Sequence, residues 1–155
     1  MTSTLEPAIR HRTVVVGLVW NRDGKLLVCK MPENRGVFPG AWGFAGGGIE
    51  PGERMVAALQ RELREELGIE IEDPQPAFFK DCLHSKTLPD GSQQMIYMIF
   101  LVFHCRAEST EIRLNDEFSE FRWVTESEAQ ELDLNSETLD TLSRIGPWSD
   151  LDFSV

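Results

Sequence analysis

Three glutamates on one predicted helix face are the residues of this sequence that first point to chemistry. Glu62, Glu65 and Glu66 stand at i, i+3 and i+4, so a helix places them on one side. Like charges at this spacing destabilise a helix by about 0.2–0.5 kcal/mol per pair, and anions are also disfavoured near its C-terminal end. Grouped carboxylates are ligands for Mg²⁺ or Mn²⁺, which would supply the missing countercharge. The alternative is a solvated acidic face, partly neutralised by Arg61 and Arg64.

The loop before this helix favours the metal site. Gly46, Gly47 and Gly48 carry no side chains, so a ligand or metal can approach their backbone closely. Glu53 stands at the predicted start of the helix, where a negative charge is favourable. We therefore expect the glycines and the glutamates to form one site.

The segment from Gly47 to Ile69 resembles the signature of the Nudix hydrolases at every fixed position. It reads Gly47, five residues, Glu53, seven residues, and then Arg61-Glu62-Leu63-Arg64-Glu65-Glu66-Leu67-Gly68-Ile69. Nine specified positions across 23 residues make a chance match very unlikely.

Further segments are similar to the Nudix nucleoside triphosphatases that prefer pyrimidine deoxynucleotides. These are Lys30-Met31, residues 35–40, Trp42, and residues 46–54, 95–98, 115–123 and 133–135. The similarity covers roughly residues 12–145. The chain departs from that subgroup in about ten extra residues before the first strand and in the tripeptide Gly43-Phe44-Ala45.

The resemblance implies that water attacks a phosphorus of a nucleoside diphosphate linked to a further group, with divalent cations between the acidic site and the phosphates. It also implies that Arg61 orients a carboxylate, for which Glu53 is the candidate. The implied metal ligands are Glu62, Glu65, Glu66 and the backbone carbonyl of Gly47.

The general base is open, because Nudix enzymes are not uniform about it. Glu62, Glu65 or an acid from a separate loop could accept the proton. Asp116, Glu117 and Glu120 precede a predicted strand where the family often supplies an extra acid. We favour Glu117, and the alternative is a surface acid.

Substrate recognition is expected to use a stacking surface and a few hydrogen bonds. The candidate stacking residues are Phe38, Trp42, Phe44 and Tyr97, for which core packing is the alternative. The candidate cations for phosphate or sugar oxygens are Arg35, Lys30 and Arg22, for which solvent exposure is the alternative.

The helices and strands around this site are predicted from the hydrophobic pattern and from the turn residues between them. Thr13–Trp20 and Lys25–Met31 read as strands joined by the turn 21–24, and residues 32–52 as a long irregular loop. The predicted helix spans Arg54–Leu67 and ends at Gly68. Its expected core-facing residues are Val56, Leu59, Leu63 and Leu67.

The second half predicts strands at 77–88 and 93–105 joined by the turn 89–92, and a short strand at Phe121–Val124. Thr125 and Glu128 are expected to form a capping box that begins a short helix, and Asn135 is expected to cap a last helix over Ser136–Ile145. We expect an α+β fold, an α/β/α sandwich with a mixed sheet between helices, which the resemblance identifies as the Nudix fold. One domain over 1–155 is expected, with a core at about 12–145 and flanking tails 1–11 and 146–155.

Charge and composition exclude several classes. The 155 residues carry a net charge of −11, which argues against a nucleic-acid polymer or an anionic membrane as partner. Residues 108–155 hold 13 acidic and 3 basic side chains, which favours a solvated surface there. Three cysteines without CxxC spacing and no apolar stretch in residues 1–12 predict a reducing, cytoplasmic location. The longest apolar run, Met95–Phe103, is too short to span a bilayer.

The expected activity is that of a Mg²⁺-dependent enzyme, with Mn²⁺ as a possible substitute, which cleaves nucleoside triphosphates to the monophosphate and pyrophosphate. Pyrimidine deoxynucleotides are the preferred substrates that the resemblance implies. One alternative is a pyrophosphatase for nucleotide sugars or ADP-ribose. Another is a non-catalytic nucleotide-sensing or binding module. The partner is expected to be a small nucleotide, and the chain a monomer or homodimer.

Overall fold

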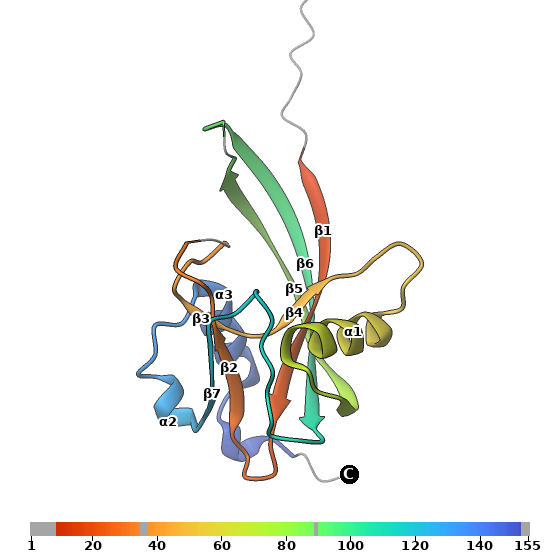
Figure 1. The fold of residues 1–155 in the computed structure, drawn as a ribbon, viewed down its shortest axis with the longest axis vertical. Coiled ribbons are helices and arrows are strands. Elements are labelled where there is room, and N and C mark those ends of the chain that lie inside the picture. Colours follow the sequence, from red (N-terminus) through yellow and green to blue (C-terminus); the bar gives the residue numbers. More distant parts are fainter. Residues whose placement is uncertain (1–8, 35–36, 89, 153–155) are drawn as a thin grey trace, which may run out of the picture.

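A computed structural model of the chain describes residues 9–34, 37–88 and 90–152 (Figure 1). Within these residues seven strands form one sheet in the order β3-β2-β1-β6-β5, with β4 paired to β1 and β7 paired to β2. The strands are β1 (Arg10–Trp20), β2 (Leu26–Lys30), β3 (Trp42–Gly43), β4 (Gly46–Gly48), β5 (Ile71–Thr87), β6 (Gln93–Ala107) and β7 (Glu120–Val124). The helices are α1 (Met55–Leu67), α2 (Glu126–Ala129), α3 (Ser136–Ile145) and the 3₁₀ helix η1 (Trp148–Asp150).

The sheet is mixed, as expected. β1 runs parallel to β6 along its whole length, from Arg10 opposite Ile96 to Trp20 opposite Arg106. The neighbouring pairs β1–β2 and β5–β6 are antiparallel, which confirms the two predicted hairpins. β5 begins six residues earlier than predicted and contains two register irregularities, between residues 72 and 75 and between 76 and 78. Pro74 and Pro76 lie in this stretch, where a sequence pattern indicates a break rather than a strand.

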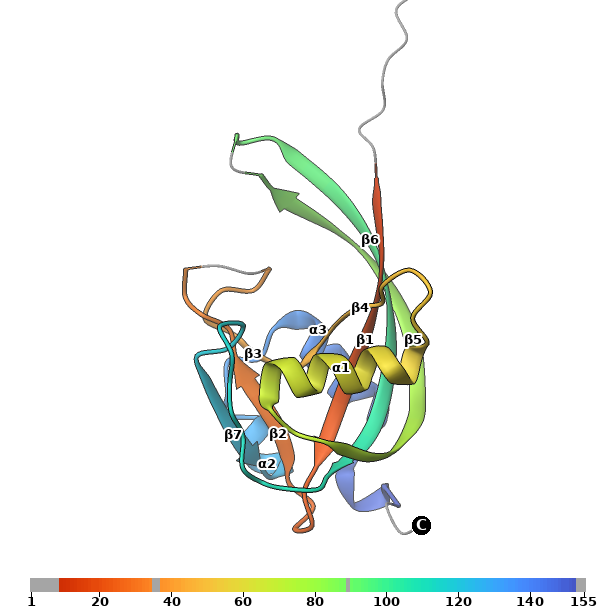
Figure 2. The ribbon, with the colours of Figure 1, turned by 45° about the vertical axis from the view of Figure 1, so that its right-hand side comes forward.

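β1 contributes side chains to both faces of the sheet because neighbouring residues of a strand point to opposite sides. Val15 and Val19 pack in one core with residues of α1, whereas Leu18 and Trp20 pack on the other side near α3 and η1. Figure 2 shows α1 crossing in front of the sheet and α3 behind it. The predicted sheet between helices is therefore confirmed.

Helix α1 lies close against β1. A Cβ atom added to Gly17 would lie 2.9 Å from Leu63 Cδ1, so a larger residue there would force the Leu63 side chain to shift. Leu59, Leu63 and Leu67 are buried as predicted. The prediction for Val56 was wrong, because it is 39% exposed in the first helical turn and the buried stripe begins only at Ala58.

The segment 32–52 is not wholly irregular. It contains the two short strands β3 and β4, and β4 pairs with β1 through Gly46, Gly47 and Gly48. A Cβ atom on Gly46 would overlap the carbonyl oxygen of Val15, so only glycine allows this approach. Glycine is depleted in strands, and its presence hid β4 from the sequence pattern.

Local capping signals at the end of the chain are confirmed. Thr125 and Glu128 form the predicted capping box of α2. Asn135 Oδ1 accepts a hydrogen bond from the backbone N–H of Thr138 at 2.8 Å, and α3 has the predicted bounds. No helix within the described ranges is long and apolar enough to cross a membrane.

Candidate active site

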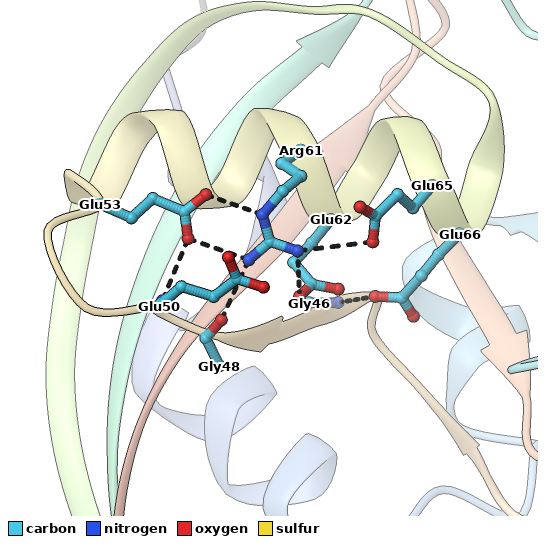
Figure 3. Close-up of polar contacts among 8 residues, drawn as sticks. All are labelled: Gly46, Gly48, Glu50, Glu53, Arg61, Glu62, Glu65 and Glu66. Atoms are coloured by element: carbon cyan, nitrogen blue, oxygen red, sulfur yellow. Dashed lines mark hydrogen bonds and ion pairs between the residues drawn. The ribbon is translucent and has the colours of Figure 1, made fainter.

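Arg61 lies at the centre of the glutamate cluster (Figure 3). Its Nε donates to Glu53 Oε2 at 2.7 Å, and its Nη2 donates to Glu53 Oε1 at 2.9 Å. This bidentate pair lowers the pKa of Glu53 to about 2, mainly through the hydrogen bonds from Arg61. The backbone N–H of Glu50 also donates to Glu53 Oε1, at 3.1 Å. Glu53 is therefore a fixed anion at the start of α1.

The same guanidinium joins the helix to β4. Nη1 of Arg61 donates to Glu62 Oε1 at 3.0 Å and to Glu65 Oε2 at 3.4 Å, while Nη2 donates to the carbonyl of Gly48 at 3.2 Å. One cation thus contacts three of the four carboxylates. It holds them in place but does not neutralise them.

Glu66 is the buried member of the cluster, with 4% of its surface exposed. The backbone N–H of Gly46 donates to its Oε1 at 3.3 Å. Burial, followed by the neighbouring Glu62 carboxylate, raises the pKa of Glu66 well above its ordinary value. A Cβ atom on Gly47 would overlap the Glu62 carboxylate, so the glycine makes room for it. Closely packed oxygens with an unmet negative charge suit a hard divalent cation.

An acidic hollow of about 260 Å³ opens beside these carboxylates. Glu117, the predicted loop acid, also lines this hollow, and its charge contributes to the raised pKa of Glu66. Neither Asp116 nor Glu120 is among the described residues around it, and Glu120 instead pairs with Lys30 at 3.6 Å. The lining residues are Arg12, Gly46, Gly47, Glu62, Glu65, Glu66, Asn115 and Glu117.

A larger cavity of about 420 Å³ adjoins the acidic hollow. Both are lined by Arg12, Gly46, Gly47, Glu66 and Glu117. Its other walls are mostly apolar, with a few polar groups from β5 and α3. This combination of an apolar cavity and an acidic hollow is suited to a ligand with a flat apolar part and a charged tail.

The structure brings only part of the predicted stacking set to this cavity. Phe38 and Phe44 line it. Trp42 is 6% exposed and lies in the core, with the Arg122 guanidinium 5.0 Å from its ring. Tyr97 is also outside the cavity lining, and its hydroxyl donates to Asp81 Oδ2 at 2.6 Å.

Of the three predicted cations, Lys30 and Arg22 line neither the cavity nor the acidic hollow. Arg35 lies outside the described residues. Lys30 pairs with Glu33 and Glu120, and Arg22 lines a separate hollow beside Trp20.

The sequence reasoning missed several polar residues of the cavity. Lys80, His84 and Glu137 line it, from β5 and the first turn of α3. Lys80, Cys82 and His84 stand two positions apart along one strand, a spacing that places all three side chains on one face. Their meeting with α3 joins residues more than 50 positions apart, which the sequence pattern does not show. Arg12, at the start of β1, was also missed.

Comparison with known proteins gives consistent matches. The model of the NUDIX domain matches residues 10–145. The nucleoside triphosphatases NudI of Salmonella paratyphi B and Salmonella enteritidis PT4 are each 49% identical over 140 residues, which are 89% of this chain and 99% of theirs. The MutT NUDIX hydrolase from Burkholderia pseudomallei is 25% identical with a TM-score of 0.66, covering 88% of this chain and 98% of that one. The MutT protein from Methanosarcina mazei Go1, at 22% identity and a TM-score of 0.74 over 94% and 100% of the chains, shares the fold.

Proposed function

Because the chain belongs to the NUDIX family, we propose that it is a Mg²⁺-dependent enzyme that hydrolyses nucleoside triphosphates, with a preference for pyrimidine deoxynucleotides, to the monophosphate and pyrophosphate. The observation that carries the proposal is the junction of the acidic hollow with the largely apolar cavity. The names of the 49% identical relatives support a triphosphate as substrate. The pyrimidine preference rests on the sequence resemblance.

In this proposal Glu62, Glu65, Glu66 and the carbonyl of Gly47 hold Mg²⁺, with Mn²⁺ as a substitute. The buried Glu66 and the half-buried Glu62 carry neighbouring carboxylates that repel each other, which fits such an ion. The bound ion supplies charge neutralisation at the phosphate oxygens and lowers the pKa of water. Arg61 acts as a positioning residue, since its contacts fix the carboxylates of Glu53, Glu62 and Glu65 relative to one another.

Glu117 is proposed as the general base, with Glu62 and Glu65 as the alternatives. It faces the hollow from the loop before β7. In the reaction it takes a proton from the attacking water, a new P–O bond forms, and the phosphoanhydride bond breaks. The electron pair of that bond leaves with the departing phosphate-bearing group, so that the two products are the nucleoside monophosphate and pyrophosphate.

The nucleoside is proposed to occupy the cavity, with Phe38 and Phe44 beside the base. Arg12 lines both the cavity and the hollow, so its guanidinium is placed to contact phosphate oxygens between them. Its guanidinium also lies against β4, where Arg12 Nε would be 3.1 Å from a Cβ atom on Gly48.

A substrate panel tests this function. Purified protein with Mg²⁺ is incubated with dUTP, dTTP, dCTP, purine triphosphates, ADP-ribose and UDP-glucose, and the products are identified by chromatography. We expect monophosphate and pyrophosphate from the pyrimidine deoxynucleotides at the highest kcat/KM. Preferred cleavage of ADP-ribose or UDP-glucose would replace the proposed substrate class. Binding without any turnover would identify a nucleotide-sensing module instead.

A further inference from the structure

A second cluster of metal-ligand residue types lies in the wall of the cavity. Cys82 and His84 stand two positions apart on β5 and face the first turn of α3, which carries Glu137. One ligand atom from each of the three lies within 4.8 Å of the other two. All three side chains are half-buried. No member of this cluster lines the acidic hollow beside α1.

Lys80 holds the Glu137 carboxylate in a defined orientation. Its ammonium group lies 2.9 Å from Glu137 Oε2, and it also donates to the Glu137 carbonyl at 3.0 Å and to Asp140 Oδ2 at 2.8 Å. The other carboxylate oxygen, Oε1, faces His84 Nε2 at 3.2 Å. One oxygen is thus fixed by a donor while the other faces the imidazole. Metal-binding carboxylates are commonly oriented by such a partner.

We propose that Cys82, His84 and Glu137 form a binding site for Zn²⁺, distinct from the glutamate site for Mg²⁺. Sulfur and imidazole ligands favour Zn²⁺ over Mg²⁺, and three protein ligands leave a fourth position for water or a ligand atom. Cysteine binds as the thiolate, so metal uptake releases the thiol proton to solvent. Burial raises the pKa of the Cys82 thiol, so it is neutral until a metal displaces its proton. Once it is a thiolate, the three anions Cys82, Glu137 and Asp140 exceed the two neighbouring cations, Lys80 and Arg144, by one charge.

The position of this site gives it a consequence for substrate binding. His84 and Glu137 line the 420 Å³ cavity, and the Phe38 ring lies with its centroid 5.8 Å from that of His84. A metal ion there would occupy part of the space that the nucleoside needs. We therefore expect Zn²⁺ to inhibit competitively with nucleotide. This consequence rests on the proposed function, whereas metal binding itself does not.

Titration with Co²⁺, a spectroscopic substitute for Zn²⁺, tests the site without any activity measurement. With Mg²⁺ in excess to occupy the glutamate site, we expect a thiolate-to-cobalt charge-transfer band that saturates at one equivalent bound and is removed by added Zn²⁺. Cys82→Ser should abolish the band, and Glu137→Gln should weaken binding. Cys105→Ala is the matched control, because Cys105 is buried in the core with 2% exposure. Co²⁺ at the glutamate site adds no such band. The proposal is wrong if wild type shows no band, or if Cys82→Ser retains it.

Inhibition kinetics separate the two proposals. With Mg²⁺ in excess, low Zn²⁺ should raise the KM for the nucleotide in wild type and in Cys105→Ala, but at least about tenfold less effectively in Cys82→Ser. Equal inhibition of all three proteins would overturn the competition at this cluster. Absence of hydrolysis in all three would refute the proposed function, while the Co²⁺ titration would still decide the metal site.

Discussion

At the scale of the residue, Arg61 is the single group on which the acidic site depends for its geometry. A lysine keeps the charge but has no planar fork, so it cannot make the bidentate pair with Glu53 and also reach Glu62 and Gly48. We expect Arg61→Lys to lower kcat about 10- to 100-fold with little change in fold. Arg64→Lys is the matched control, since Arg64 makes a similar pair with exposed Glu70 on the same helix. Equal rates for both variants would remove Arg61 from the site.

Glu117 is distinguished from its neighbours by its place on both the cavity and the hollow. If it accepts the proton from water, Glu117→Gln should lower kcat by about 10²–10⁴-fold while KM changes little. Asp116→Asn, one position earlier in the same loop, should retain activity. A near-normal rate for Glu117→Gln would transfer the role to Glu62 or Glu65.

Arg12 is the cation that sequence reasoning passed over, and it stands between the two parts of the site. Loss of its charge-assisted hydrogen bonds to phosphate should raise KM for a triphosphate by about 10- to 100-fold in Arg12→Ala. The inhibition constant of the monophosphate product should change less, because that product has fewer phosphate oxygens. Arg10→Ala, two positions earlier on β1, serves as the control because Arg10 lines neither space. Equal effects on triphosphate and monophosphate would argue for a purely structural role.

At the scale of the element, the sequence predicted the helix caps correctly but did not predict the strand that depends on close packing of the backbone. The cap Asn135 and the Thr125–Glu128 capping box act within four residues, so the sequence alone predicted both helix starts. The strand β4 was missed because its three glycines carry no pattern, although their lack of side chains is what lets it lie beside β1 and Glu62.

The candidate site likewise has one part that the local sequence predicts and one part that depends on contacts between distant segments. Its acidic half lies on one helix and one preceding loop, and a fixed-spacing signature was enough to find it. The other half requires β5 to meet α3 across more than 50 residues of chain, as Lys80 meets Glu137 and Asp140. The sequence made Trp42 a candidate for stacking on the substrate, because an aromatic residue in a predicted loop can either face a ligand or pack into the core. The structure places it in the core.

The packing of α1 on β1 connects stability to metal binding. A Cβ atom on Gly17 would lie 2.9 Å from Leu63 Cδ1, and α1 also carries the glutamates. We expect Gly17→Ala to lower the free energy of unfolding by about 1–3 kcal/mol and to weaken Mg²⁺ binding, measured by denaturation and calorimetry.

Leu63→Ala provides the internal check on this prediction. In that background the added methyl has room, so its further cost should be smaller than in wild type. Additive effects of the two substitutions would show that the helix does not respond to this contact.

At the scale of the whole molecule, an acidic protein is paired with an anionic substrate, and the net charge of −11 does not oppose this. The acids of residues 108–155 are mostly surface groups, with Glu117 facing the site. The functional charge lies in the nearly neutral first two-thirds, where Glu62 and Glu66 face the hollow. The repulsion that weakens the metal-free protein there is also what prepares the site for a divalent cation.

This coupling predicts how stability depends on pH with and without metal. The pKa of Glu66 is raised in the folded state, mainly by burial, so folding favours the protonated form. In the presence of a chelator, the stability from this group is complete below its ordinary pKa of 4.5 and is lost as pH rises toward the raised value. Mg²⁺ should restore stability at neutral pH and have little effect at acidic pH, because it binds the deprotonated carboxylates.

Glu66→Gln isolates this effect. The variant should lose most turnover, but in chelator its melting temperature should exceed that of wild type at neutral pH and vary less with pH. Thermal unfolding from acidic to mildly alkaline pH, with chelator or with Mg²⁺, measures both curves. Arg64→Gln alters charge on the same helix but removes no buried carboxylate, so its metal-free curve should keep the wild-type slope. If the melting temperature of Glu66→Gln in chelator depended on pH as steeply as that of wild type, Glu66 would not be the source of this pH dependence.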